Sequence, residues 1–141
     1  MTDEKNIARL ALEIAGSCPA MRSRALARAV ARVFDEALRP HGIKSSQFAV
    51  LVAIGALGQC RPMDIAAELL LSRAAVTRAI NVLESRKWIQ STEKAARMRT
   101  LELTATGKNL LVQAESQWRM AVERVGKSVE VLPDPRSIDA L

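Results

Sequence analysis

Two short helical segments separated by a three-residue turn constrain the fold of this chain more than any other feature. Residues 62–69 begin with Pro, an allowed first helical residue, and carry Asp64 in the first turn, where the positive end of a helix favours a carboxylate. Ser72 can then cap a second helix over residues 73–85, because its hydroxyl can accept a hydrogen bond from a backbone N–H of the first turn. The pattern predicts a helix-turn-helix, although no Gly stands in the turn.

The second helix has two faces of opposite character. Val76, Ile80 and Leu83 recur at spacings of four and three, so they share one side of the helix and are expected to face the core. The opposite side carries Ala74, Thr77, Arg78 and Asn81. In a DNA major groove, Arg can bind guanine, Asn adenine, Thr a phosphate or a base edge, and Ala a thymine methyl. A solvated surface helix is the alternative explanation of this polar stripe.

A polar stretch follows and then returns as a strand. Residues 101–104 alternate between apolar and polar, which is typical of a half-buried strand, so residues 90–104 predict a two-stranded wing. Its tip carries Lys94, Arg97 and Arg99, and the negative potential of a narrow minor groove attracts Arg. Residues 72–100 hold seven Lys or Arg and two Asp or Glu, and therefore +5 of the formal net charge of +6. This concentration favours duplex DNA, although a basic surface alone does not exclude RNA.

Length and composition agree with one mainly α domain that has a small β-wing. The chain has 141 residues, 49% of them hydrophobic but only 3% aromatic, which is typical of a helical protein rich in Ala and Leu. The longest uncharged run, residues 45–60, falls short of the roughly 20 apolar residues that span a bilayer, and the N-terminus carries no signal core. We therefore expect a cytoplasmic protein without a membrane anchor.

The inventory of catalytic residues argues against an enzyme. The chain has one His, two distant Cys and no Tyr, and it contains no Gly-rich phosphate loop, GxSxG or HExxH motif. A single His also leaves no His-rich metal site. We expect no enzymatic activity, no metal and no cofactor.

The order and spacing of several motifs resemble the MarR (multiple antibiotic resistance regulator) family of bacterial winged helix-turn-helix repressors. The resemblance rests on residues 28–43, Gln47-Phe48, Asp64-Ile65-Ala66, Ala75-Val76-Thr77-Arg78, residues 83–89 and Leu103-Thr104-Ala105-Thr106-Gly107. It implies a DNA-binding lobe over residues 45–104, flanked by dimerisation helices in residues 1–44 and 105–141. The expected DNA contacts are Ser72, Arg73, Ala74, Thr77, Arg78 and Asn81 from the second helix and Lys94, Arg97 and Arg99 from the wing, with Arg97 in the minor groove.

Two departures from the family pattern concern the wing. Ala95 stands where the family usually has an Asp that helps to fix the wing, and Lys87 stands where it often has Gly. We expect a looser wing, and either strain in the turn at Lys87 or a longer turn there.

Long helices on both sides of this unit favour a homodimer. One begins after Pro19 and follows a shorter helix that ends at Gly16. The other begins near Thr106 and carries an apolar stripe at alternating spacings of three and four: Leu111, Ala114, Trp118, Ala121, Val125, Val129 and Leu132. We interpret the stripe as a seam for a second subunit, with packing inside one subunit as the alternative. A twofold dimer separates its recognition helices by one DNA turn, ~34 Å, and requires a pseudo-palindromic operator.

The resemblance implies a signal, either a small aromatic or phenolic ligand or an oxidant. The ligand pocket of the family lies between the dimerisation helices and the DNA-binding lobe, and the candidates here are Arg22, His41, Gln47 and Trp118. We expect His41 to be exposed in a loop and Gln47 to support a helix start.

Cys18 is the candidate oxidant sensor, because helix-terminal N–H groups and Arg22 can lower the pKa of its thiol. The chain lacks the tyrosines that hold the thiol in the hydroperoxide sensors, and a Cys18–Cys60 disulfide is not expected in a reducing cytoplasm. The leading hypothesis is a homodimeric repressor that binds double-stranded DNA and is released from it by a small-molecule ligand. The alternatives are an oxidant-sensing regulator that uses Cys18 and a winged-helix protein-interaction module.

Overall fold

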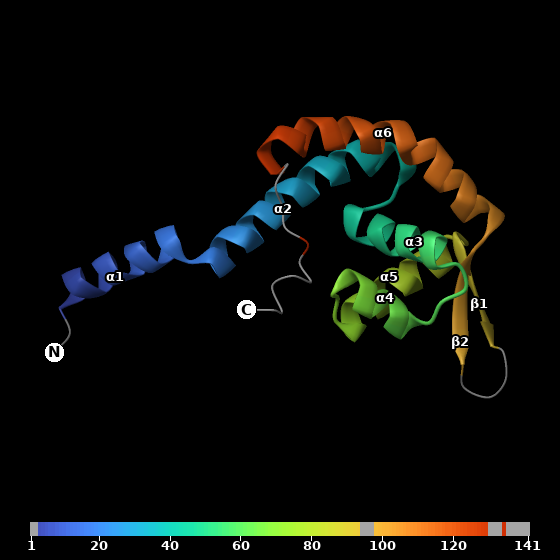
Figure 1. The fold of residues 1–141 in the computed structure, drawn as a ribbon, viewed down its shortest axis with the longest axis horizontal. Helices are drawn as coiled ribbons and strands as arrows, with labels where there is room; N and C mark the ends of the chain where they lie inside the picture. Colours follow the sequence, from blue (N-terminus) through green and yellow to red (C-terminus); the bar gives the residue numbers. More distant parts are fainter. Residues whose placement is uncertain (1–2, 94–97, 130–133, 135–141) are drawn as a thin grey trace.

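The computed structural model describes residues 3–93, 98–129 and 134. Within them the chain is mainly helical with one small sheet, which confirms the predicted fold class (Figure 1). The elements are α1 (Glu4–Ser17), α2 (Pro19–Leu38), the 3-10 helix η1 (Arg39–His41), α3 (Ser45–Leu57), α4 (Pro62–Leu69), α5 (Arg73–Ser85), β1 (Ile89–Glu93), β2 (Arg99–Leu103) and α6 (Ala105–Val129). No helix among these described residues is both long and apolar enough to cross a lipid bilayer.

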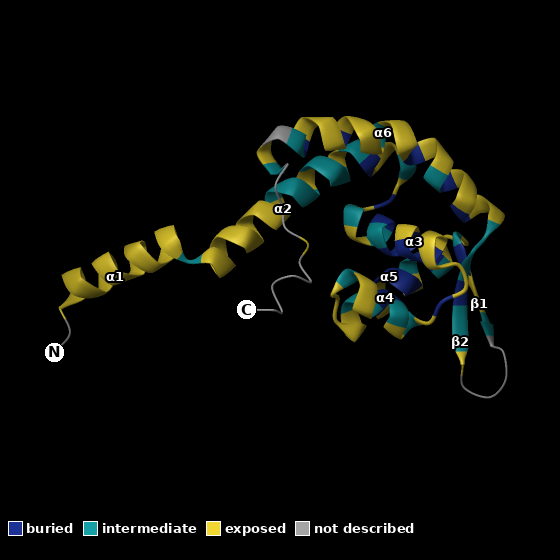
Figure 2. Cartoon of the chain, in the orientation of Figure 1, coloured by how far each residue is buried: buried dark blue, intermediate teal, exposed yellow. Residues whose placement is uncertain are grey.

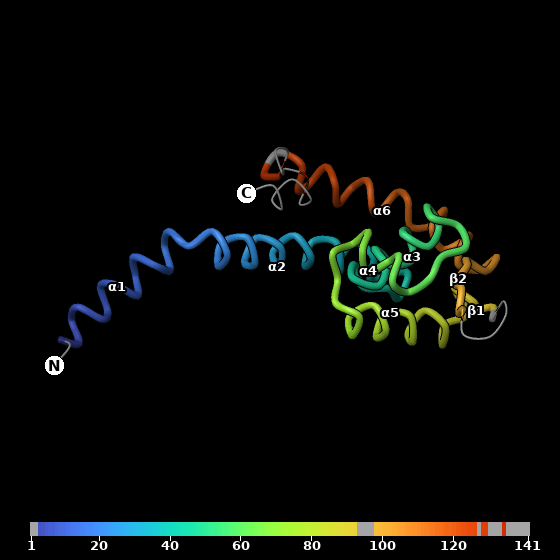
Figure 3. Tube along the Cα trace, turned by 60° about the horizontal axis from the view of Figure 1, so that its bottom comes forward, coloured from blue at the N-terminus to red at the C-terminus, as the bar shows by residue number. Residues whose placement is uncertain are grey.

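The structure consists of a compact lobe, the two long helices α2 and α6, and a projecting arm formed by α1. Helices α3, α4 and α5 and the wing make the lobe, and α6 runs back over it along α2 (Figure 1). Helix α1 continues outward from the start of α2 and points away from the lobe in both views (Figures 1 and 3).

One apolar core holds the lobe together. Its most deeply buried side chains include Leu51 and Ile54 of α3, Ile65 of α4 and Leu101 of β2, each with an exposed fraction of 0%. On α5, Val76, Ile80 and Leu83 are exposed by 1%, 1% and 0%, so the prediction that these three residues face the core is confirmed.

No described part of the chain buries the arm formed by α1. No residue of α1 along its described range is buried, and the first half of α2 is exposed as well (Figure 2). The apolar residues of α1 therefore lie in solvent, with exposed fractions of 52% for Ile7, 56% for Leu10 and 49% for Ile14. The helix ends at Ser17, one residue beyond the predicted Gly16.

The apolar stripe of α6 is partly covered by the chain itself. Ala114, Ala121 and Val125 are exposed by 0%, 2% and 8% in the single chain, where α6 packs along α2. Our interpretation of these three positions as a seam for a second subunit was therefore wrong, because amphipathic spacing does not specify which surface covers a helix. Trp118 on the same stripe remains 38% exposed, and Leu132 lies outside the described residues.

The wing is an antiparallel hairpin, as the sequence predicts. Its register pairs Ile89 with Leu103 and Glu93 with Arg99. Cys60 attaches the hairpin to the turn before α4, because its backbone N–H donates to Leu101 O at 3.1 Å and its carbonyl accepts from Leu101 N at 2.7 Å. The wing is thus fixed to the lobe at its base.

Threonines and a glycine make the corner between the wing and α6. The hydroxyls of Thr104 and Thr106 donate to the carbonyl oxygen of Lys87 at 2.7 and 3.0 Å. At Gly107, an added Cβ would lie 2.0 Å from the carbonyl oxygen of Trp88, too close for any side chain. The start of α6 can approach the wing only because residue 107 is Gly.

Gly107→Ala should therefore lower the free energy of unfolding by about 2–4 kcal/mol, because a backbone carbonyl must move to admit the methyl group. Gly126→Ala is the matched control in the same helix, since no atom lies within 4 Å of its added Cβ, and it should raise that free energy by about 0.5–1 kcal/mol. Urea denaturation of both variants measures the difference, and equal stability would contradict the close approach.

Candidate nucleic-acid interface

Helix α5 begins as the sequence predicts. The hydroxyl of Ser72 accepts a hydrogen bond from the backbone N–H of Ala75 at 3.2 Å, which confirms the N-cap. In the turn before it, Leu70 has φ 52° and ψ 41°, the left-handed conformation that Gly usually supplies. The N–H of Leu71 donates to Ala66 O at 3.0 Å and closes the end of α4. The turn thus keeps helix-turn-helix geometry with Leu in a strained position.

The outer stripe of α5 is open to solvent. All six predicted contact residues on or before this helix are exposed: Ser72, Arg73, Ala74, Thr77, Arg78 and Asn81. Helix α5 runs along the outer edge of the lobe, with no other element beyond it in the view of Figure 3. The side chains that could read a groove therefore point away from the core that holds the helix.

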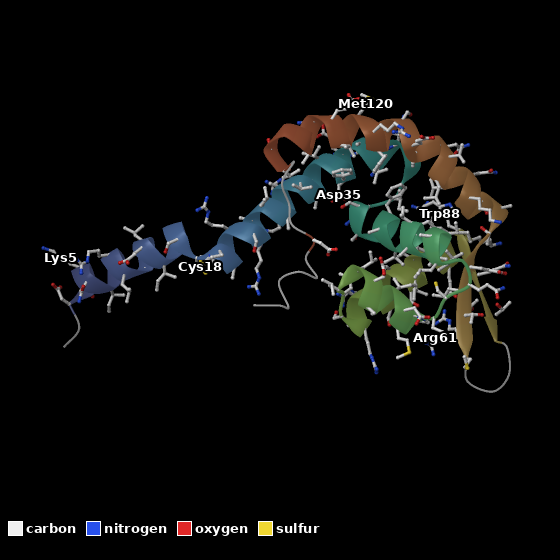
Figure 4. All side chains as sticks on the ribbon, viewed as in Figure 1. Lys5, Cys18, Asp35, Arg61, Trp88 and Met120 are labelled. Carbon is white, nitrogen blue, oxygen red and sulfur yellow. The ribbon has the colours of Figure 1, made fainter. Side chains whose placement is uncertain are left out.

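An ion pair at the start of α4 adds a cation that the sequence analysis missed. Arg61 binds both carboxylate oxygens of Asp64, through Nε at 3.2 Å and Nη2 at 3.0 Å, and its backbone N–H donates to the same carboxylate at 2.8 Å. These hydrogen bonds hold the pKa of the Asp64 carboxyl below its usual range. The pair fixes Arg61 beside the wing (Figure 4).

Clefts with basic residues flank α5 on both sides. The first has a volume of about 410 Å³ and brings Arg61, Arg73 and Arg99 together beside Thr77. The second, of about 380 Å³, brings Lys44 at the start of α3 next to Arg78. Spacing along the chain could not reveal Arg61 and Lys44 as neighbours of α5, because each comes from another element.

An ion pair joins Arg99 of the wing to α5. The Nη2 of Arg99 lies 2.6 Å from Oε1 of Glu84, so this predicted contact residue is already paired within the chain. Lys94, Ala95 and Arg97 lie outside the described residues, and so does the expectation of a looser wing at Ala95.

In the turn between α5 and the wing, the structure shows strain, one of the two outcomes expected from the family resemblance. Lys87 has φ 58°, a left-handed conformation that costs a residue with a Cβ about 1–2 kcal/mol. Beside it, Nη2 of Arg86 donates to Gly42 O at 3.2 Å, and its guanidinium lies 5.2 Å from the centre of the Trp88 ring. The end of α5 is thereby fixed to the loop that follows η1.

Lys87→Gly should raise the free energy of unfolding by about 1 kcal/mol, because Gly adopts this conformation without a steric penalty. Lys87→Ala removes the same charge but keeps a Cβ, so it should give no such gain. Urea denaturation of the two variants compares them, and equal stabilities would show that the backbone at this position stores no strain.

A cavity of about 460 Å³ lies between α2, α3, α4 and α6. Of the four predicted ligand residues, Trp118 lines it, whereas Arg22 is exposed on α2 and is not among the described lining residues. Gln47 accepts a hydrogen bond from the N–H of Lys44 at 3.1 Å, which confirms that it supports the start of α3. His41 is half-buried, and its Nε2 lies 3.1 Å from Oε1 of Gln117, so the expectation of an exposed His was wrong. Gln117 belongs to α6, so spacing along the chain could not reveal this contact.

The two cysteines occupy different environments, and neither forms a disulfide. Cys18 is half-buried at the bend between α1 and α2, where it is the N-terminal cap residue of α2 (Figure 4). Cys60 is only 4% exposed, and burial, with a smaller effect of the Asp64 charge, raises the pKa of its thiol. Cys60 therefore has the character of a buried apolar residue. Within the described part of the chain, no cluster of three or more His, Cys, Asp or Glu could hold a metal ion.

A helix-turn-helix with a fixed two-stranded wing defines the winged helix-turn-helix class. The MarR family model matches residues 41–98. The crystal structure of the transcriptional regulator MosR of M. tuberculosis superimposes with a TM-score of 0.75 at 27% identity, covering 89% of this chain and 93% of that one. MosR in complex with DNA gives a TM-score of 0.74 at 30% identity, covering 88% and 92%.

Two further relatives agree with these matches. The reduced form of MarR from E. coli has the same fold, with a TM-score of 0.67 at 21% identity over 79% of this chain and 84% of that one. The uncharacterized HTH-type transcriptional regulator YwoH of Bacillus subtilis is 36% identical over 64 residues, which cover 45% of this chain and 47% of YwoH, about half its length. The chain belongs to the MarR family of transcriptional regulators.

Proposed function

We propose that this regulator is a homodimeric repressor that binds a pseudo-palindromic operator and is released by a small-molecule ligand. The proposal rests on the opposite exposure of the two sides of α5: its apolar side is buried, while Thr77, Arg78 and Asn81 are exposed. Basic residues in the clefts on both sides of this stripe support the proposal, because phosphates flank a helix inserted in a DNA groove. The DNA-bound structure of MosR supports a DNA partner for this chain.

Each predicted contact residue has a role in the proposal. Thr77, Arg78 and Asn81 read base edges in the major groove, and Ala74 meets a thymine methyl. Ser72 lies at the start of the helix, where backbone N–H groups favour a phosphate. Four cations complete the interface, Arg97 in the minor groove and Arg73, Lys94 and Arg99 on phosphates.

The exposed arm supports the homodimer. An isolated helix as short as α1 is marginally stable in water, so its apolar residues call for a partner surface. Ile7, Leu10 and Ile14 share one face of α1 and are each about half exposed. A second copy of the chain would cover this face and would set two α5 helices about 34 Å apart on the DNA. In this proposal residues 45–104 bind DNA, and residues 1–44 and 105–141 form the dimer.

The cavity between the long helices and the lobe supports release by a ligand. It is bordered by α2 and α6 on one side and by α3 and α4 on the other. A molecule bound there contacts both the proposed dimer helices and the lobe that carries α5. Its binding can therefore favour one arrangement of the two parts over another.

Selection of bound sequences from a pool of random duplexes tests the proposal. A twofold dimer should enrich inverted repeats whose half-sites are about 10 base pairs apart, centre to centre. Enrichment of unrelated sequences, or of a single half-site, would contradict the proposed mode of binding.

Arg78→Ala should weaken binding to the selected duplex by about 1–3 kcal/mol and relax base preference at one position, because Arg78 is proposed to read a base. Arg73→Ala should instead weaken specific and random duplexes alike and lower the salt slope by about 1, because a phosphate contact carries no sequence information. Fluorescence anisotropy at several salt concentrations separates the two effects. Equal losses of Arg78→Ala on both duplexes would remove its base-reading role.

Leu10→Glu should raise the dissociation constant of the dimer by roughly tenfold or more, because it places a charge on the apolar face of α1. Leu12→Glu is the matched control, since Leu12 is 75% exposed and lies on another face of the same helix. Analytical ultracentrifugation measures both constants. Equal constants for the two variants, or a monomeric wild-type chain at micromolar concentration, would contradict the role of the arm.

A further inference from the structure

The charged residues at the two ends of α5 oppose its helix dipole. A helix favours acidic residues near its N-terminus and basic residues near its C-terminus, because these ends carry partial positive and partial negative charge. Helix α5 instead begins with Arg73 and has Glu84 in its last turn, with no acidic residue in the first turn and no basic residue in the last. Local rules do not explain these two charges, so we expect each of them to serve a contact outside the helix.

Glu84 makes such a contact with the wing. Its Oε1 lies 2.6 Å from Nη2 of Arg99, and the side chains of Arg99 and Glu84 are exposed by 41% and 28%. Arg99 is the first residue of β2, at the end opposite the one that leads into α6. Ion pairs between partly exposed side chains contribute little to stability, so stability alone is a weak reason for this pair. Its effect on position is larger, because it joins the C-terminal end of α5 to the outer end of β2.

Arg99 also belongs to the cleft beside the exposed stripe of α5. It lines this cleft together with Arg61, Arg73 and Thr77. An Arg guanidinium has five N–H groups in a rigid plane, so one group can bind a carboxylate while another donates to a phosphate. Glu84 can therefore orient the cation that the proposed function assigns to a phosphate without occupying all of its donors.

A carboxylate at this place affects operator and random DNA differently. Its repulsion of nearby phosphates acts on every sequence alike, because the phosphate backbone carries no sequence information. The orientation of Arg99 does depend on sequence. A guanidinium held in one position meets a phosphate only when α5 lies at the correct depth in the groove, whereas an unrestrained one can reach a phosphate of any duplex.

We infer that Glu84 is a specificity-determining residue that acts through Arg99. It holds this cation in one position relative to α5, and it thereby lowers the affinity for random DNA more than the affinity for the operator. The inference rests on the proposed function for the DNA partner, whereas the ion pair itself is a contact within the chain.

Glu84→Gln tests the inference, because it removes the negative charge and keeps the size of the side chain. Fluorescence anisotropy measures the dissociation constants of a random duplex and of the duplex selected by the wild-type protein, and the ratio of the two constants defines the specificity. We expect the variant to bind random DNA more tightly and the selected duplex with little change, so that the ratio falls roughly fivefold or more. An equal gain on both duplexes would show charge repulsion alone. Equal losses, or no change, would show no role in specificity, and each of these results would overturn the inference.

A second substitution shows whether Glu84 acts through Arg99. In an Arg99→Gln background the partner of Glu84 is absent, so adding Glu84→Gln should leave the ratio unchanged. A further fall of the ratio in the double variant would contradict this route.

Glu115→Gln is the matched control. Oε1 of Glu115 lies 2.7 Å from Nη2 of Arg119 on α6, so the substitution removes a similar ion pair outside the clefts that flank α5. The ratio should keep its wild-type value. A fall as large as that of Glu84→Gln would show that loss of any such pair lowers the specificity, and it would overturn the inference.

The wild-type ratio separates this inference from the proposed function. A high wild-type ratio that Glu84→Gln leaves unchanged would overturn the inference and leave the repressor proposal intact. A wild-type ratio near one would contradict sequence-specific binding of an operator, and with it any role of Glu84 in specificity.

Discussion

The burial of one side of α5 is the constraint on which the rest of the structure depends. Val76, Ile80 and Leu83 are almost completely excluded from solvent in the core that α3, α4 and β2 share. Each such side chain contributes about 1.5–3 kcal/mol on burial, so rotation of the helix about its axis would be costly. Since that rotation is fixed, the opposite stripe with Thr77 and Arg78 is fixed in direction as well. A surface that reads a groove requires this precision.

The loop around η1 connects this rigid lobe to the long helices. His41 lies within hydrogen-bond distance of Gln117 on α6, and Arg86 at the end of α5 donates to the carbonyl of Gly42. The Arg86 guanidinium also lies over Trp88, immediately before the wing. Polar contacts of this loop therefore join α6 to the end of α5. The cavity of about 460 Å³ borders the same long helices.

Local sequence rules predicted the parts of the fold that depend on neighbours in the chain. The cap at Ser72 and the two faces of α5 follow from residue type and spacing. Strain at Lys87 was instead expected from the resemblance to the MarR family, which often has Gly at this position. Contacts between distant segments were not predictable in this way. The ion pair between Arg99 and Glu84 joins the wing to α5, and residues of four helices line the cavity of about 460 Å³. The α6 stripe shows the same limit, because its period predicts a helix with one apolar face but not which surface covers that face. The single chain buries three of its positions and leaves Trp118 38% exposed.

Fluorescence anisotropy shows whether α5, held in this position, reads a DNA sequence. The purified protein is titrated against the DNA upstream of its own gene and against a shuffled duplex of equal length and composition, at several salt concentrations. If α5 reads DNA, the affinity should fall steeply with salt and should be ~10³-fold or more higher for the upstream DNA than for the shuffled duplex. Equal and weak binding to both duplexes would contradict it and would favour a winged-helix surface that binds another protein.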